Sequence, residues 1–199
     1  MADKHVFVET NFLVDILRPV PGPDAESLYG RHKSRGLVLH VPWCCASEAL
    51  RTLQRIIDED LGFDDKLMRF VVAEYKKDPE NFDKAPFDKL RQQLKDAKTE
   101  ALKSLPRRLD QVMASVELIE PSRAAVDRVI GLFKIKSLKP WDEMVAGCVL
   151  ARMTEIRAKD ATAQLYFCSL DKGYESGSDG WKAQFAALKC IIQSDFDVP

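Results

Sequence analysis

Residues 5–13 read HVFVETNFL, a short and mainly apolar run that ends in an acid and leads directly into a helical pattern. The run at 5–8 is typical of a buried strand, and the apolar spacing after it predicts a helix to about residue 17, before Pro19. A strand of this kind has no local structural need for Glu9, because buried carboxylates are rarely left unpaired. The segment therefore predicts an α/β fold with an acidic site at the end of its first strand.

Apolar runs and helical patterns alternate along the rest of the chain. Further strands are predicted at 37–41, 116–119, 165–169 and 190–193, and further helices at about 24–33 (with Asp24 as its cap), 46–57, 124–133 and 140–157. Strands separated by helices imply right-handed crossovers, hence a three-layer α/β/α fold with a central, mainly parallel sheet. Residues from about 60 to 115 are polar, helical and strand-free. We interpret them as a helical insert in a single domain that spans residues 1–199.

Composition narrows the class of protein. The 199 residues are 46% hydrophobic and 31% charged, enough chain for one sizeable α/β domain. Apolar runs such as 37–41 and 145–150 are too short to span a bilayer, and the N-terminal residues lack a signal-peptide pattern. Five cysteines without a Cys-x-x-Cys pair are expected to be mostly buried thiols in a reducing cytoplasm. A formal net charge of −1 means that any sign of nucleic-acid binding must be local.

Several common chemistries lack their motifs. The chain has no Gly-x-x-x-x-Gly-Lys or Gly-x-Gly-x-x-Gly loop for phosphates and no Gly-x-Ser-x-Gly turn for a serine hydrolase. His5, His32 and His40 lack metal-ligand spacing, so we interpret them as structural or surface residues. A small-molecule phosphatase would need an Asp-x-Asp nucleophile, but here Glu9 is followed by Asn11.

Four acids remain, each at a junction between a predicted strand or loop and a helix: Glu9, Glu48, Asp142 and Asp171. In an open parallel sheet, ligands bind outside the carboxyl ends of the strands. Carboxylates that converge there repel one another unless a cation lies between them. Oxygen ligands without Cys or His favour Mg²⁺ or Mn²⁺ over Zn²⁺. The acids therefore predict a site for a hard divalent cation.

The four segments around these acids resemble, in order, the motifs of the PIN domain family. They are ETN at 9–11, where the family usually has Asp-Thr-Asn, SEAL at 47–50, WDEMVAGC at 141–148 and SLD at 169–171. The resemblance covers almost the whole chain. Only the stretch between Glu48 and Asp142 is longer than in compact members of the family, so the resemblance says nothing about its helices.

The resemblance implies a metal-dependent ribonuclease that hydrolyses RNA phosphodiester bonds with Mg²⁺ or Mn²⁺. Glu9, Glu48 and Asp142 are then the metal ligands and catalytic acids. Asp171 is either a further ligand or the group that holds the attacking water. The residues that orient these carboxylates are Asn11 and Ser169.

The family includes the toxin ribonucleases of toxin–antitoxin pairs, so the resemblance also implies a small inhibitory partner protein; it leaves a homodimer open. Glu9 stands where the family usually has Asp, and its extra methylene pushes the carboxylate further into the site. The alternative is therefore a catalytically inactive PIN-like module that binds nucleic acid or protein.

Ordinary structural roles stay open for the same residues. Glu48 and Asp142 are predicted in first helical turns, where the helix dipole favours acids without any metal. Asp171 is able to open a turn with Gly173, and Asn11 is able to cap a helix.

The insert has a local excess of positive charge. Residues 84–108 contain eight Lys or Arg and three acids. Such cations attract a phosphate backbone irrespective of its sequence, and the candidate contacts are Lys89, Arg91, Lys95 and Lys98. The alternative is a solvated helix with pairs of Lys and acidic side chains.

Overall fold

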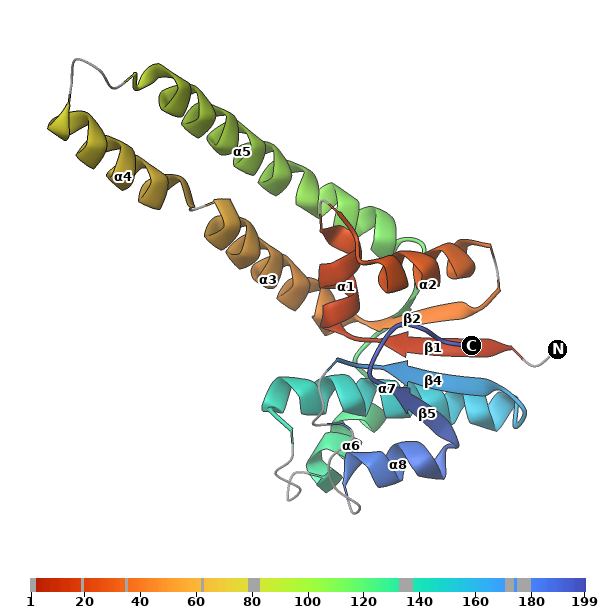
Figure 1. Ribbon diagram of the computed structural model, residues 1–199. Helices are drawn as coiled ribbons and strands as arrows, with labels where there is room; N and C mark the ends of the chain where they lie inside the picture. Colours follow the sequence, from red (N-terminus) through yellow and green to blue (C-terminus); the bar gives the residue numbers. More distant parts are fainter. Residues whose placement is uncertain are drawn as a thin grey trace. The chain divides into compact units, whose positions relative to one another are not determined.

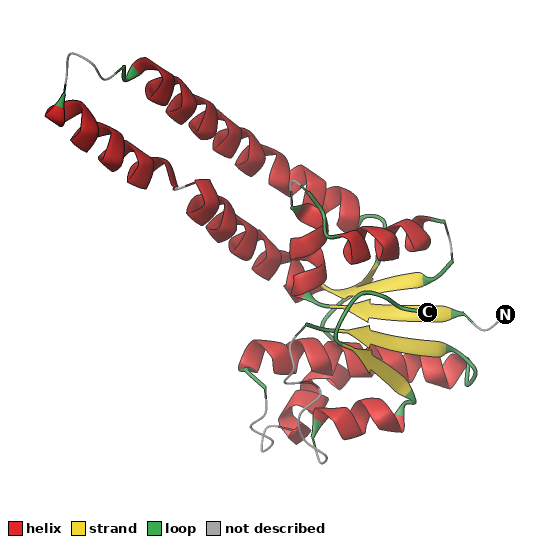
Figure 2. Cartoon of the chain, viewed as in Figure 1, coloured by secondary structure: helices red, strands yellow, loops and turns green. Residues whose placement is uncertain are grey.

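A parallel β-sheet lies at the centre of the computed structural model of the chain (Figures 1 and 2). The structure describes residues 3–18, 20–34, 36–61, 63–78, 83–132, 138–170, 174 and 180–199, without the side chains of 60, 61, 63–67 and 132. Within this part, five strands form the sheet in the order β3-β2-β1-β4-β5, and all neighbours are parallel. They are β1 (Lys4–Val8), β2 (Val38–Pro42), β3 (Glu117–Ile119), β4 (Gln164–Cys168) and β5 (Cys190–Gln193). Each lies within one residue of a predicted strand.

Helices cover both faces of the sheet. They are α1 (Thr10–Leu17), α2 (Pro23–Lys33), α3 (Trp43–Leu61), α4 (Phe63–Lys77), α5 (Ala85–Met113), α6 (Arg123–Leu132), α7 (Pro140–Lys159) and α8 (Trp181–Ala187). On one face, Phe167 of β4 stacks on Phe185 of α8 with 4.9 Å between ring centroids. The next residue of β4, Cys168, points to the opposite face, where the charges of Asp195 and of Arg31 in α2 act on its thiol. This arrangement confirms the predicted three-layer α/β/α fold.

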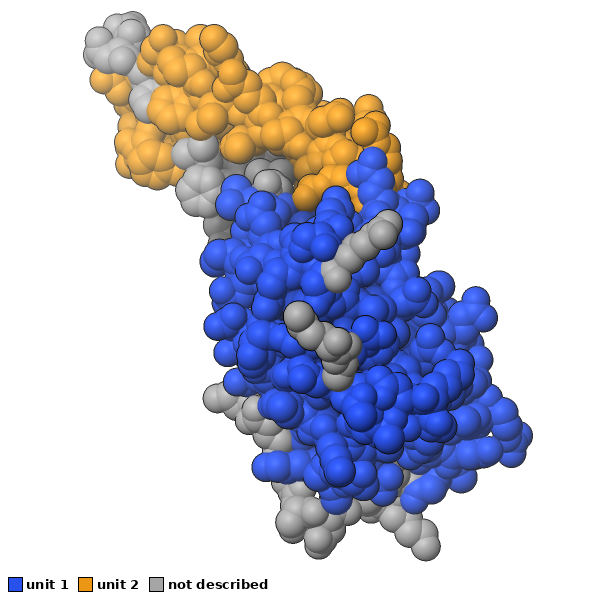
Figure 3. All heavy atoms as spheres, turned by 90° about the vertical axis from the view of Figure 1, so that its right-hand side faces the viewer, with its two compact units in different colours: residues 1–49, 109–199 blue, residues 50–108 orange. Residues whose placement is uncertain are grey.

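The chain divides into two compact units, coloured separately in Figure 3. Unit 1 comprises residues 1–49 and 109–199 and contains the sheet, whereas unit 2 comprises residues 50–108. Unit 2 contains α4 and most of α3 and α5, with Val71 and Leu105 in its interior. The described residues between 60 and 115 form no strand, but the single-domain organisation stays a prediction. No helix in the described ranges is long and apolar enough to cross a membrane.

Helix α7 lies in the core of unit 1 and is buried around most of its circumference. Residues 145–151 are all buried, because the helix packs against α6, α8 and the sheet. Gly147 permits the close approach of α6, since a Cβ atom there would lie 2.9 Å from the carbonyl oxygen of Ala125 and 2.7 Å from Cγ2 of Val129. Pro140 opens the helix at a position where the missing N–H carries no penalty. The first turn of α7 is thereby held rigidly beside the sheet.

Two local predictions are wrong. Asp24 does not cap α2: the cap is Gly22, Pro23 is the first helical residue, and Asp24 lies in the first turn, where it complements the helix dipole. Helix α8 is absent from the predicted elements. Its seven residues span about two turns, too short for a clear apolar period, and burial of Trp181 and Phe185 in the core stabilises it instead.

Candidate functional site

Glu9 and Ser169 meet at the carboxyl edge of the sheet although 160 residues separate them. Each directly follows its strand, and β1 and β4 are neighbours in a register that pairs Val8 with Cys168. The chain runs outward from β1 through β2 to β3, then returns to place β4 and β5 on the other side of β1. The boundary between β1 and β4 is therefore the topological switch point, where open α/β sheets bind their ligands. Figure 1 shows the strand arrowheads directed to this edge.

One carboxylate oxygen of Glu9 is held by three hydrogen bonds. The hydroxyl of Ser169 donates to Oε1 at 2.5 Å, the backbone N–H of Leu170 at 3.1 Å and Nδ2 of Asn11 at 3.2 Å. Among the described residues, no donor reaches Oε2. Glu9 is only 5% exposed, so this network fixes the carboxylate within the protein and leaves one oxygen for another ligand.

The position of Asn11 excludes its ordinary structural role. The N-cap of α1 is Glu9, and its side chain makes no capping hydrogen bond. Asn11 is the second residue of the helix, and its amide turns back to the Glu9 carboxylate. The open alternative of Asn11 as a helix cap is therefore wrong, and its contact is the orienting one proposed from the sequence.

Burial dominates the protonation of Glu9. Desolvation raises the pKa of its carboxyl group, and the negative charge of Asp142 raises this pKa further. The hydrogen bonds from Ser169, Asn11 and Leu170 act in the opposite direction without cancelling the rise. A carboxylate held in this way is stabilised by any cation that approaches Oε2.

Glu48 is connected to the same segment through a residue that the sequence did not single out. The hydroxyl of Thr10, buried at the start of α1, donates a short hydrogen bond to Oε2 of Glu48. Glu48 is the sixth residue of α3 and half-buried, so its predicted place in the first turn is wrong. The helix dipole, which falls off within the first turn, does not account for this acid. The Thr in ETN was the available signal, because a hydroxyl beside two acids is a natural donor.

Asp142 lies in the first turn of α7, as predicted, together with the buried Glu143. Its backbone carbonyl accepts a hydrogen bond of 3.1 Å from the hydroxyl of Tyr174, and its charge acts on Glu9. A role in complementing the helix dipole stays open for this residue. Asp171, the fourth predicted acid, lies outside the described residues.

The donor chemistry of the site suits a hard cation, because the available groups are carboxylate oxygens. Within the described ranges, however, no group of three or more His, Cys, Asp or Glu side chains is arranged to hold a metal ion. The structure therefore brings Glu9, Ser169 and Asn11 into contact and ties Glu48 to Thr10. A shared metal position for Glu9, Glu48, Asp142 and Asp171 stays a prediction.

Two exposed tryptophans flank this edge of the sheet. Trp43 is 44% exposed at the start of α3, directly after β2, and Trp141 is 40% exposed directly before Asp142. Tryptophan is buried in most proteins, so exposed rings beside a site of acids indicate a surface that a ligand covers.

The histidines have structural contacts. Nδ1 of His5 and Nε2 of His40 lie 2.9 Å apart, and burial lowers the pKa of His40 to about 3. Nε2 of His32 lies 2.6 Å from the carbonyl oxygen of Ser115. These contacts agree with the interpretation of the three residues as structural.

The predicted basic residues of the insert differ in their environment. Lys89, Arg91 and Lys95 are exposed on α5. Nζ of Lys98 instead lies 2.9 Å from Oδ1 of Asp58, also in unit 2, so its charge is already neutralised. The alternative of a solvated, ion-paired helix therefore applies to Lys98.

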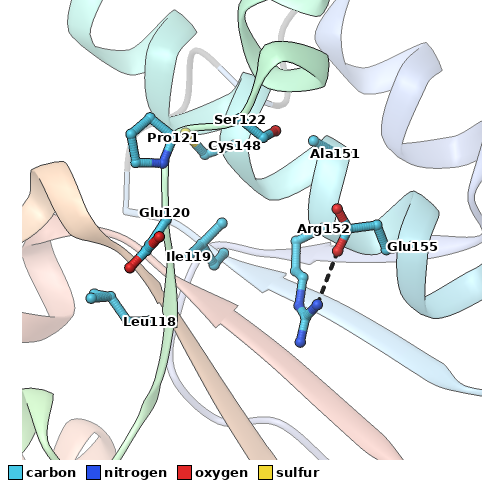
Figure 4. A pocket seen from close by; sticks show the side chains of 9 residues that line it. All are labelled: Leu118, Ile119, Glu120, Pro121, Ser122, Cys148, Ala151, Arg152 and Glu155. Carbon is cyan, nitrogen blue, oxygen red and sulfur yellow. Dashed lines mark hydrogen bonds and ion pairs between the residues drawn. The ribbon is translucent and has the colours of Figure 1, made fainter.

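A separate pocket of about 370 Å³ lies between the end of β3 and α7 (Figure 4). Arg152 and Glu155 form an ion pair of 2.9 Å across its wall, and burial raises the pKa of the Cys148 thiol to about 11. The arginine is already paired and the thiol is protonated at neutral pH. None of the predicted site acids lines this pocket, so it is not the candidate site.

Comparisons with known proteins leave the family open. No protein-family model matches the chain, and no curated protein matches it. The crystal structure of FitAcB from Neisseria gonorrhoeae aligns over 94% of this chain and 96% of that chain, with 10% sequence identity and a TM-score of 0.35. A TM-score this low carries no argument about fold or function. The functional interpretation accordingly depends on the site itself.

Proposed function

We propose that the protein is a metal-dependent ribonuclease of the PIN-like type, which hydrolyses RNA phosphodiester bonds. The observation that carries the proposal is the environment of Glu9. A buried carboxylate with one oxygen fixed by three donors and the other without a donor lies at the topological switch point, near a second negative charge. Such an arrangement costs stability without a cation, so a function that uses one explains it.

The proposed site would hold Mg²⁺ or Mn²⁺ through Glu9, Glu48 and Asp142, with Asp171 as a ligand or as the holder of the attacking water. Such an ion polarises a phosphoryl oxygen and lowers the pKa of bound water. The chain's own part is to orient the acids. Ser169, Leu170 and Asn11 direct Glu9 with their donors, and Thr10 directs Glu48.

Single-stranded RNA is the proposed substrate, because the exposed rings of Trp43 and Trp141 suit unpaired bases, which stack on aromatic side chains. An inhibitory partner protein belongs to this proposal through the family resemblance alone. All five cysteines are free thiols, in keeping with the proposed cytoplasmic location.

Cleavage of a labelled single-stranded RNA tests the proposal. Purified protein with Mn²⁺ should cut the RNA, EDTA should stop the reaction, and Asp142→Asn should slow it by at least about tenfold to 100-fold, the cost typical of disturbing a metal site. Equal rates for wild type and Asp142→Asn would mean that a contaminant or other residues do the cutting. Circular dichroism controls for the fold of the variant.

The second candidate function is a PIN-like module that binds nucleic acid or protein without cutting. Glu9 in place of the family's usual Asp favours it, as does the lack of a three-acid grouping in the described part of the chain. Glu9→Asp separates the two candidates. If the site is active with Glu, the shorter acid should bind metal worse and cut more slowly. If the site is degenerate, wild type should show no metal-dependent cleavage and Glu9→Asp may restore some.

A further inference from the structure

We propose that a groove between α4 and α5 in unit 2 binds the phosphate backbone of single-stranded RNA. The groove has a volume of about 560 Å³ and is lined by Met68, Arg69, Val72, Ala73, Lys76, Lys84 and Arg91. Four of these side chains are cationic and none is acidic. The choice of RNA among polyanions rests on the proposed function.

The four cations line the groove in two rows. Arg69 and Lys76 are seven residues apart on α4, and Lys84 and Arg91 are seven residues apart at the start of α5. Lys84 continues the helical pattern, because its carbonyl accepts the backbone N–H of Asp88 at 3.1 Å. Seven helical residues span two turns, or about 10 Å. The charge is thus spread along an extended groove, which fits a chain of phosphates better than a single anion.

These cations are largely uncompensated. Within the described part of the chain, no acid lies within 4.0 Å of the charged groups of Arg69, Lys76 or Arg91. Lys84 makes only a 3.6 Å pair with the exposed Asp88, and surface pairs of this kind contribute little. Neighbouring cations of unit 2 differ in this respect, since Lys77 pairs with Glu74 at 2.6 Å and Lys98 with Asp58 at 2.9 Å.

The floor of the groove is apolar, with Met68 buried and Val72 38% exposed. Cationic walls over an apolar floor suit a single strand, whose phosphates contact the walls while sugars and bases cover the floor. This assignment replaces three of the four basic residues predicted from the sequence and keeps Arg91.

The test measures binding without cleavage. The affinity of full-length protein for a fluorescein-labelled 20-nucleotide oligouridylate is followed by fluorescence anisotropy in EDTA over a range of salt concentrations. In R69Q/R91Q the slope of log affinity against log salt should fall by about 1.4, because each phosphate contact with a single strand contributes about 0.7. The matched control K77Q/K98Q removes the same charge from paired positions and should change the slope by less than half as much.

Two further measurements guard the result. R69K/R91K keeps both charges and should retain the wild-type slope, which distinguishes lost contacts from a misfolded helix pair. Equal losses in R69Q/R91Q and K77Q/K98Q would overturn the proposal, because diffuse charge would then explain binding. Tighter binding of polyglutamate than of oligouridylate would also overturn it in favour of an acidic protein partner. Because EDTA prevents metal-dependent cleavage, a failed groove and a failed ribonuclease give separate results.

Discussion

Ser169→Ala tests the idea that the end of β4 holds Glu9 in place. The substitution removes the shortest of three hydrogen bonds to Oε1, 2.5 Å long, between residues that are 2% and 5% exposed. Hydrogen bonds to charged groups contribute about 1.5–3 kcal/mol. The donors of Leu170 and Asn11 remain, so the oxygen is not left unpaired. We therefore expect the free energy of unfolding to fall by about 2 kcal/mol where Glu9 is ionised.

The loss should depend on pH. The Ser169 hydroxyl favours the ionised carboxylate, so its removal raises the pKa of Glu9 further. At pH 4 the carboxyl group is protonated with or without the hydroxyl, because burial already holds its pKa above the usual value. The lost bond is then a neutral one, worth about 0.5–1.5 kcal/mol. The difference between wild type and Ser169→Ala should shrink by about 1 kcal/mol from pH 7 to pH 4.

Urea denaturation followed by tryptophan fluorescence measures this difference. Trp43, Trp141 and Trp181 all belong to unit 1, so the signal reports the unit that contains Ser169. With a denaturant slope of about 2 kcal/mol/M, the midpoint should fall by about 1 M.

Ser47→Ala is the matched control for this measurement. The hydroxyl of the exposed Ser47 bonds only the Cys44 carbonyl, at 3.1 Å, so its loss should cost less than about 0.5 kcal/mol. Equal midpoints for the two variants, or a loss in Ser169→Ala that does not change with pH, would refute the reasoning.

Three further predictions follow from the same site. Since the pKa of Glu9 is raised in the folded state, its contribution to stability is present below the unfolded pKa and lost as pH rises through the folded one; thermal melts of Glu9→Gln from pH 4 to 8 should therefore fall less than those of wild type. Asp142→Asn removes a like charge, so a ¹³C NMR titration should show a lower pKa for Glu9 than in wild type. Oligouridylate should quench the fluorescence of Trp43 and Trp141 but not of the buried Trp181, and a protein with both exposed tryptophans changed to Phe should show no quenching.

The strands and most helices could be predicted because their causes are local. The run at 5–8 and the polar stretch after residue 60 show their type in the period and polarity of neighbouring residues. The acid after β1 was conspicuous for the same reason, since nothing near it in the sequence explains it. Helix α8 escaped because its stability comes from burial of Trp181 and Phe185 and not from a local pattern.

The site depends on causes that are not local. The contact between Glu9 and Ser169 requires that β4 return beside β1, and strand order follows from how the crossover helices bury both faces of the sheet. The direction of the Glu9 pKa follows from desolvation and from a charge 133 residues away in sequence, at Asp142. In unit 2, only the fold distinguishes Lys98, neutralised by Asp58, from Arg91 in its open groove. The sequence by itself determined which segments form strands and helices and which acids lack a local role. Tertiary structure decided which of those side chains meet, because desolvation and charge interaction depend on distance in space.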